Sequence, residues 1–240
     1  MSAELAVVGL GRMDYEEAWA LQRAVASARI DGTLQRDHLL LVEHPPVITK
    51  GRAASAANVL LSPEQLAARH IHVHEVERGG DVTFHGPGQL VGYPIYNLNE
   101  HRPDLHVFLR QLEQALIAAL DHFGIEGSRR EGLTGVWVDN RKIASIGIHV
   151  KKWVTWHGFA LNVMTDLTFF DLIVPCGIDQ VLMTNMQKEL NETAPRDLWG
   201  RALDYTILGF CETFSQQPQA VELGDLRHQL PAPAVPDRRA

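Results

Sequence analysis

The chain has 240 residues, enough to bury a substantial core in one domain, and its apolar and charged fractions of 45% and 21% are ordinary for a globular protein. Its formal net charge of −7 argues against nonspecific nucleic-acid binding, which requires a basic surface. Two cysteines are too few for a disulfide framework, and the sequence has neither a signal-peptide pattern nor a membrane-spanning apolar run. We therefore expect a cytoplasmic protein without a membrane or nucleic-acid partner.

Capping and apolar patterns predict one helix and two strands in the first third of the chain. Asp14 precedes an apolar helical pattern that ends at Gly32, and Glu17 lies where it would complete a capping box. Residues 38–43 form a short apolar run typical of a buried strand, and residues 71–76 alternate as a strand does.

Strands outnumber helices in the rest of the chain. A helix is expected from Asp104 to Gly124, because an apolar stripe follows the acidic N-cap Asp104, and another helix is expected over 197–215. Strands are expected over 135–138, 142–150 and 154–163. Since these strands follow one another directly, we predict an α+β fold: a single domain with a mixed, largely antiparallel sheet flanked by helices. We expect this domain to end at residue 215, with 216–240 as a flexible C-terminal tail.

The segment 78–94, RGGDVTFHGPGQLVGYP, holds five glycines and two prolines between strand-like segments. Such a density of glycine suggests a loop that brings the backbone close to a ligand. Its spacing matches neither a dinucleotide fingerprint nor a P-loop. The other interpretation is a tight connection between strands, whose glycines only meet turn geometry. Arg78 and His85 favour a binding role, because a bare connector needs neither residue.

Cysteine and lysine provide two further candidates for chemistry. Cys176 lies between Pro175 and Gly177, where its sulfur could face a pocket, although free cysteines are more often buried in cores. Cys211 has an apolar helical setting, and we interpret it as a core residue. Lys142 begins a strand, where lysine is usually solvated. If it faces a pocket with Cys176, its charge would stabilise a thiolate and its amine could shuttle protons.

Three alternating histidines, His70, His72 and His74, could lie on one side of a strand and suggest a metal site. They have no acidic or cysteine partner at ligand spacing, so we interpret them as surface histidines and expect no metal.

Several motifs together resemble the lipoyl(octanoyl) transferase family. They are Arg78-Gly-Gly-x-x-Thr-Phe-His-Gly-Pro-Gly-Gln-Leu-x-x-Tyr-Pro94, Gly135-Val-Trp, Arg141-Lys-Ile-Ala-Ser-Ile-Gly147, His157-Gly-Phe-Ala-Leu-Asn162 and Pro175-Cys-Gly177. The resemblance spans most of residues 10–190 and implies the α+β fold of the biotin and lipoate protein ligase catalytic domains. Phe159 stands where the family commonly has leucine. This difference affects how the acyl chain fits the pocket and leaves the reaction chemistry unchanged.

The resemblance also implies the residues of the site. Cys176 corresponds to the nucleophile and Lys142 to the acid/base, with no metal and no cofactor. The acyl pocket is implied to consist of Arg78, Gly79, Gly80, Asp81, Val82, Thr83, Phe84, His85, Ser145, Ile146, Gly147, Gly158, Phe159 and Ala160.

The implied reaction moves an octanoyl or lipoyl group from acyl carrier protein to a lysine ε-amine through a thioester on the cysteine. The implied donor is octanoyl-acyl carrier protein, and the acceptors are lipoyl domains of 2-oxoacid dehydrogenases and the glycine cleavage H protein. Because such partners are acidic, we expect one basic rim made of Arg129, Arg130, Arg141, Lys151 and Lys152. The alternatives are an ATP-dependent lipoate or biotin ligase, a thioesterase and a non-catalytic binding module.

Overall fold

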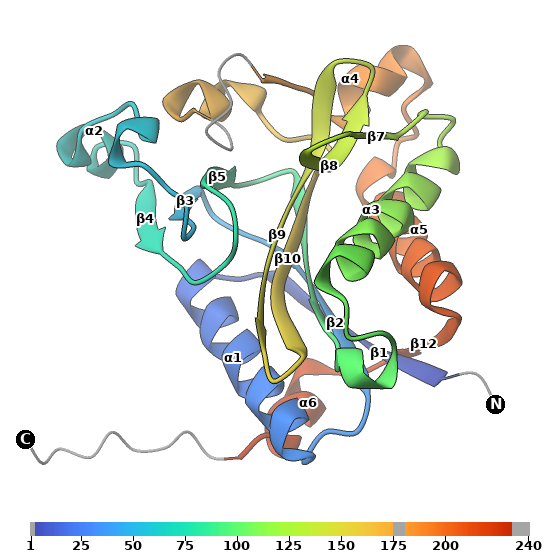
Figure 1. Ribbon diagram of the computed structural model, residues 1–240. Helices are drawn as coiled ribbons and strands as arrows, with labels where there is room; N and C mark the ends of the chain where they lie inside the picture. The colour runs from blue at the N-terminus through green and yellow to red at the C-terminus, as the bar shows by residue number, and fades with distance from the viewer. Residues whose placement is uncertain (1–2, 175–180, 232–240) are drawn as a thin grey trace, which may run out of the picture.

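The computed structural model describes residues 3–174 and 181–231, and a large mixed sheet runs through its centre (Figure 1). In this part of the chain the sheet has nine strands, in the spatial order β12 (Gln216–Ala220), β1 (Ala3–Arg12), β2 (Asp37–Glu43), β6 (Gln89–Ile95), β10 (Val154–Asn162), β9 (Arg141–Lys151), β8 (Leu133–Val138) and β7 (Ser128–Arg130), with β11 (Leu182–Met183) beside β9. The pairs β12–β1, β1–β2 and β11–β9 are parallel and the other neighbours are antiparallel. The predicted α+β fold with a mixed, largely antiparallel sheet is confirmed.

A smaller sheet lies beside the large one. Its three strands are ordered β4 (His72–Glu75), β3 (Val47–Lys50) and β5 (Val82–His85), and the short helix α2 (Pro63–Ala67) lies at its outer side (Figure 1). The glycine-rich segment 78–94 joins the two sheets, because it contains β5 of the small sheet and most of β6 of the large one. Much of this segment is therefore strand rather than the loop expected from its composition.

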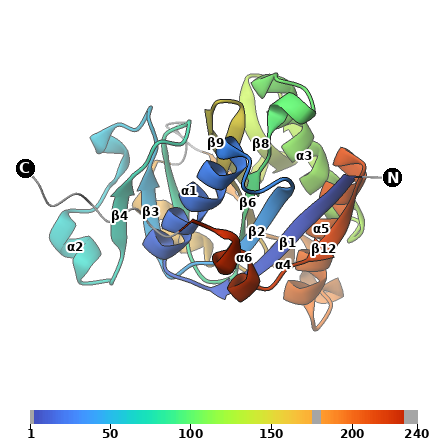
Figure 2. The same ribbon diagram turned by 90° about the horizontal axis from the view of Figure 1, so that it is seen from below.

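Helices cover both faces of the large sheet (Figure 2). On one face α3 (Leu105–Asp121) packs against α5 (Leu198–Phe214), and on the other lie α1 (Tyr15–Asp31) and α6 (Leu223–Gln229). The short α4 (Met186–Leu190) follows β11. The strand β2 shows how one sequence serves both faces: Leu39 and Leu41 enter the α3–α5 core, whereas Leu40 and Val42 enter the α1–α6 core.

The boundaries of the predicted helices agree with the structure. Asp14 caps α1 by accepting the Glu16 backbone N–H at 2.9 Å, and Gly32 ends it with a φ of 82°. The capping box is wrong, because the Glu17 carboxylate instead binds Arg227 on α6. None of the helices in the described ranges is long and apolar enough to cross a membrane.

The predicted boundary at residue 215 is wrong. Residues 216–220 form β12, which pairs with β1 from Ala3↔Gln216 onward, and Leu226 of α6 is fully buried in the α1–α6 core. Only the part of the expected tail after residue 231 lies outside the described residues. The sequence QQPQA has no strand pattern of its own, so its pairing with β1 determines its conformation.

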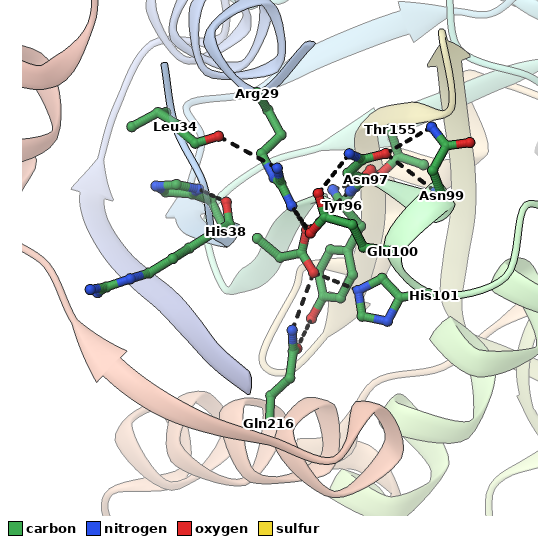
Figure 3. A network of polar contacts seen from close by, with 12 residues as sticks. Arg29, Leu34, His38, Tyr96, Asn97, Asn99, Glu100, His101, Thr155 and Gln216 are labelled. Carbon is green, nitrogen blue, oxygen red and sulfur yellow. Dashed lines mark hydrogen bonds and ion pairs between the residues drawn. The ribbon is translucent and has the colours of Figure 1, made fainter. Parts of the chain in front are cut away.

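A buried polar network holds β12 in place (Figure 3). The Asp37 carboxylate accepts hydrogen bonds from Gln216 Nε2 at 3.2 Å, His101 Nε2 at 2.6 Å and the Asn97 backbone N–H at 3.0 Å. Arg29 of α1 lies 3.4 Å from the same carboxylate. One buried charge is therefore shared by a helix, a loop and two strands.

Candidate active site

A small cavity of about 50 Å³ lies between the two sheets. It is lined by Tyr15, Arg78, Gly79, Gly80, Asp81, Val82, Thr83, His85, Val91, Tyr93, Ser145, Ile146, Gly147, His157, Gly158, Phe159 and Ala160. All the pocket residues implied by the motifs line this cavity except Phe84. The Phe84 ring is buried in the core of the small sheet, where it stacks on Phe169 with ring centres 4.6 Å apart.

Glycines in this region allow strands and loops to approach closely. A Cβ on Gly147 would lie 2.8 Å from the Gly79 carbonyl oxygen, and one on Gly158 would lie 2.1 Å from the Gly92 carbonyl oxygen. Gly80 also has a φ of 86°, which a residue with a side chain rarely adopts. The glycines thus serve close packing of the cavity wall and turn geometry, and the approach of a ligand to the backbone stays a prediction.

Arg78 attaches the start of the glycine-rich segment to the small sheet. Its Nη2 donates to the Thr49 carbonyl oxygen at 2.7 Å and to Thr49 Oγ1 at 2.9 Å, and its Nε donates to Thr49 Oγ1 at 3.2 Å. The guanidinium is buried, so these bonds compensate for its loss of hydration. Arg78 therefore fixes one wall of the cavity while adding a positive charge beside it.

Aromatic rings form another wall. The Tyr15 ring stacks on His85 with centres 6.0 Å apart, and His44 Nδ1 lies 2.8 Å from the Met13 carbonyl oxygen, to which it must donate. His44 Nε2 therefore accepts the hydroxyl proton of Tyr93 at 2.6 Å. Burial lowers the pKa of His44 to about 4 and that of His85 to about 3. Both imidazoles are uncharged near neutral pH.

His157 lies in a strained backbone position beside the cavity. Its φ is 56° although it lies within β10, and its backbone N–H donates to Gln22 Oε1 at 3.0 Å. Its Nε2 is 3.7 Å from the Glu77 carboxylate, which accepts Trp156 Nε1 at 2.9 Å. Burial opposes ionisation of Glu77, but the His157 ring beside it and the hydrogen bond from Trp156 outweigh burial and hold the pKa of this carboxyl well below its usual value.

Four lining residues were not selected from the sequence: Tyr15, Val91, Tyr93 and His157. Tyr93 and His157 belong to the motifs, and this membership is the signal that could have identified them. Tyr15 carries no such signal, because it begins a helix 63 residues before Arg78.

Lys142 is buried at the start of β9, with 2% of its surface exposed. The expectation of a solvated lysine at this strand start is therefore wrong. Its Nζ lies 5.4 Å from the centre of the Trp137 ring. The Thr184 backbone N–H donates to the Lys142 carbonyl oxygen at 2.9 Å, and Met183 of β11 pairs with Lys142. The chain that follows residues 175–180 therefore returns directly beside Lys142. Cys176 itself lies outside the described residues.

The interpretation of Cys211 as a core residue is confirmed. It lies in α5 with 6% of its surface exposed, and burial raises the pKa of its thiol. Of the three histidines, His70 lies outside β4, so the three do not share one strand face. In the described ranges no group of three or more His, Cys, Asp or Glu side chains is arranged to hold a metal ion.

The expected basic rim is not continuous. Arg141 and Lys151 are the two ends of the eleven-residue strand β9, which at ~3.3 Å per residue spans roughly 33 Å. Arg141, at the Lys142 end, pairs with Asp139 and Glu189, both at 3.0 Å. Lys151 and Lys152 lie at the opposite tip of the β9–β10 hairpin.

Comparison with known proteins places the chain in a family. The family of the lipoyl protein ligase A/B catalytic domain matches residues 14–204. The chain belongs to this family. An octanoyltransferase of Synechococcus elongatus is 52% identical over 179 residues, which cover 74% of this chain and 76% of that protein. An octanoyltransferase of Solibacter usitatus is 53% identical over 205 residues, which cover 83% of this chain and 93% of that one.

Solved structures of lipoate protein ligases have the same fold. A bi-partite lipoate protein ligase from Thermoplasma acidophilum superposes with a TM-score of 0.75 at 16% identity, covering 95% of this chain and 90% of that chain. A lipoate-protein ligase A bound with ATP superposes with a TM-score of 0.74 at 14% identity, covering 95% and 92%. The relationship expected from the motifs and the expected ligase-type fold are both confirmed.

Proposed function

We propose that this protein transfers an octanoyl group from octanoyl-acyl carrier protein to the ε-amine of a lysine on a lipoyl domain, through a thioester on Cys176. The observation that carries this proposal is the identity of 52–53% to proteins named octanoyltransferase over most of the chain. The cavity between the sheets supports it, because all the implied acyl-pocket residues except Phe84 line one space. The buried Lys142 supports the proposed acid/base, since it lies beside the chain that follows Cys176.

In the first half-reaction the Cys176 thiolate attacks the thioester carbonyl of the donor. The carbon–sulfur bond to the carrier breaks, the carrier sulfur leaves, and the Lys142 ammonium supplies its proton. The octanoyl group now forms a thioester with Cys176, and Lys142 is neutral. One thioester replaces another, so this step is nearly balanced in free energy and needs no ATP.

In the second half-reaction the neutral ε-amine of the acceptor lysine attacks the Cys176 thioester. The carbon–sulfur bond breaks, Lys142 takes the proton lost by the amine, and the thiolate is regenerated. The product is an amide, which is more stable than a thioester, so this step runs downhill. Because the acyl group rests on the enzyme, the two protein substrates bind one after the other.

The proposed partners are octanoyl-acyl carrier protein as donor, and lipoyl domains of 2-oxoacid dehydrogenases and the glycine cleavage H protein as acceptors. We assign the attraction of an acidic partner at the Lys142 end of the sheet to Arg130, because Arg129 and Arg141 at that end pair with carboxylates. Its guanidinium carbon lies 4.7 Å from the centre of the Trp137 ring, on which Lys142 also lies.

An ATP-dependent ligase is the second candidate function, because a structure with this fold holds ATP. A turnover assay separates the two. The full-length protein is incubated with an apo lipoyl domain and either octanoyl-carrier protein alone or free octanoate plus ATP. Our proposal predicts octanoylated domain from the carrier alone. Product from octanoate and ATP that persists in Cys176→Ala would instead establish the ligase.

A further inference from the structure

A chain of buried amides connects the cavity with the strand that carries Lys142. His85 Nδ1 lies 2.9 Å from Gln89 Oε1, and Gln89 Nε2 donates to Asn162 Oδ1 at 2.9 Å. Asn162 Nδ2 in turn donates to the Thr184 carbonyl oxygen at 3.0 Å. His85, Gln89, Asn162 and Thr184 are each at most 7% exposed. The three side chains come from β5, β6 and β10, and the Thr184 carbonyl belongs to the segment after β11.

Two backbone carbonyls determine which way both amides point. A carbonyl oxygen can only accept a hydrogen bond, so the atom of Asn162 beside the Thr184 oxygen must be the nitrogen. Asn162 Oδ1 then faces Gln89 and needs a donor. The Phe84 carbonyl oxygen, 3.2 Å from Gln89 Nε2, independently requires the same orientation of Gln89. Both protons of Gln89 Nε2 are thereby used.

This orientation decides the tautomer of His85. Gln89 presents its carbonyl oxygen, so His85 Nδ1 must carry a proton and donate to it. The ring of His85 is neutral near pH 7, because burial lowers its pKa to about 3. A neutral imidazole carries one proton, so Nε2 keeps its lone pair. Since His85 lines the cavity, it offers the cavity a hydrogen-bond acceptor.

The same network holds the segment that follows residues 175–180. Asn162 binds Thr184, whose backbone N–H donates to the Lys142 carbonyl oxygen at 2.9 Å. Asn185 Nδ2 adds a bond to the Thr165 carbonyl oxygen at 2.9 Å, and the Gln187 N–H donates to the Val163 carbonyl oxygen at 2.9 Å. The end of β10 thus holds the returning chain against Lys142.

We propose that Gln89 and Asn162 are positioning residues. Gln89 holds His85 with Nδ1 protonated and Nε2 as an acceptor toward the cavity, and Asn162 ties the segment after β11 to the same network. The consequence for turnover rests on the proposed acyl transfer, whereas the tautomer of His85 does not.

The tautomer is measured on full-length protein labelled with ¹⁵N-histidine, by long-range ¹H–¹⁵N correlation near pH 7. The His85 signals are assigned from their loss in His85→Asn. We expect a protonated Nδ1 and an unprotonated Nε2 in the wild type. A protonated Nε2 in the wild type would overturn the proposal.

Variants separate the two roles. In Gln89→Met the carbonyl that fixes Nδ1 is gone, so the signals of His85 should change to a mixture of tautomers or to the form protonated at Nε2. In Asn162→Asp the Phe84 carbonyl still orients Gln89, so the His85 tautomer should be retained while the bond to Thr184 is lost. Gln22→Met removes another buried glutamine amide, one that accepts the His157 backbone N–H rather than binding His85, and it should leave the tautomer unchanged. An unchanged tautomer in a folded Gln89→Met would contradict the role of Gln89.

Kinetics test the second role. Asn162→Asp should lower kcat for octanoyl transfer about tenfold, the effect of one buried hydrogen bond, with a donor KM within about twofold of wild type. An unchanged kcat in folded protein would contradict the role of Asn162. If the wild type shows the expected tautomer but transfers no octanoyl group, the network stands and the proposed function fails. If the protein transfers octanoyl groups but His85 lacks the expected tautomer, the network is rejected and the proposed function stands.

Discussion

The ammonium of Lys142 lies 5.4 Å from the centre of the Trp137 ring, in the interior of the protein. A ring face partly replaces the water that the cation loses on burial. The space for the lysine side chain comes from Gly135, where a Cβ would lie 2.6 Å from Lys142 Cε. This relationship holds a long cationic side chain inside the fold, beside the chain that follows the proposed nucleophile.

Gly135→Ala is expected to displace Lys142. Gly135 has a φ of 132°, and the added Cβ would also lie 2.6 Å from the Ala144 carbonyl oxygen, so both backbone and lysine must move. Gly132→Ala is the matched control, because Gly132 has a φ of 73° with nothing within 4 Å of the added Cβ. The control should lose about 1 kcal/mol of unfolding free energy with little change in kcat. Equal loss of kcat in both variants would contradict the space requirement at Gly135.

Docking of the acidic donor is expected to depend on the Lys142 end of β9 and not on its other end. Arg130→Glu should raise the KM for carrier protein several-fold at low salt, because it reverses a charge beside Trp137. Lys152→Glu changes the net charge equally, at the far hairpin tip, and should leave the KM unchanged. Steady-state kinetics at two salt concentrations measure both. A larger effect at Lys152 would place the donor at the hairpin tip instead.

The C-terminal helix α6 is expected to stabilise the domain. Leu226 is fully buried, so Leu226→Ala should lower the free energy of unfolding by about 2–5 kcal/mol. Leu208 on α5 is 38% exposed, and Leu208→Ala should cost clearly less. Urea unfolding of both variants makes the comparison. Equal small losses would show that residues after 215 behave as the flexible tail first expected from the sequence.

Acid is expected to destabilise the protein through its buried histidines. Burial lowers the pKa of His85 to about 3 and that of His44 to about 4, from an ordinary 6.5. The unfolded chain therefore binds protons that the folded state does not, so this stability is present above pH 6.5 and is lost as pH falls toward 4. Each histidine contributes about 2 kcal/mol to the loss between pH 7 and pH 5.

Urea unfolding at pH 7 and pH 5 checks this dependence. His85→Gln replaces the titrating ring with a group that stays neutral, so it should lose less stability between the two pH values than the wild type does. An equal loss in both proteins would show that His85 does not cause the dependence.

Local signals predicted the elements whose ends are encoded in the sequence. The N-caps Asp14 and Asp104 and the turn at Asp139 gave two helices and a hairpin at nearly the observed positions. The strand β12 was missed because its conformation depends on β1, more than 200 residues away. The place of Lys142 inside the protein was not predictable either, since a lysine at a strand start gives no sign of the glycine and tryptophan that surround it.

The motifs predicted the wall of the cavity better than local chemistry did. Only the family resemblance brought together Arg78, Ser145 and Gly158, which lie far apart in the sequence and line one space. It also included Phe84, because a motif records a continuous segment whether or not each side chain reaches the cavity. The prediction of one basic rim failed because Arg141 and Lys151 lie at opposite ends of β9, so the full length of this strand separates them.

The intact mass of the protein after incubation with octanoyl-carrier protein tests the central claim most directly. We predict one octanoyl adduct on the wild type, no adduct on Cys176→Ala, and much slower formation, at least about a hundredfold, in Lys142→Met. Adding apo lipoyl domain should discharge the adduct and produce octanoylated domain. Octanoylated domain formed by Cys176→Ala at the wild-type rate, with no adduct on the wild type, would contradict the account.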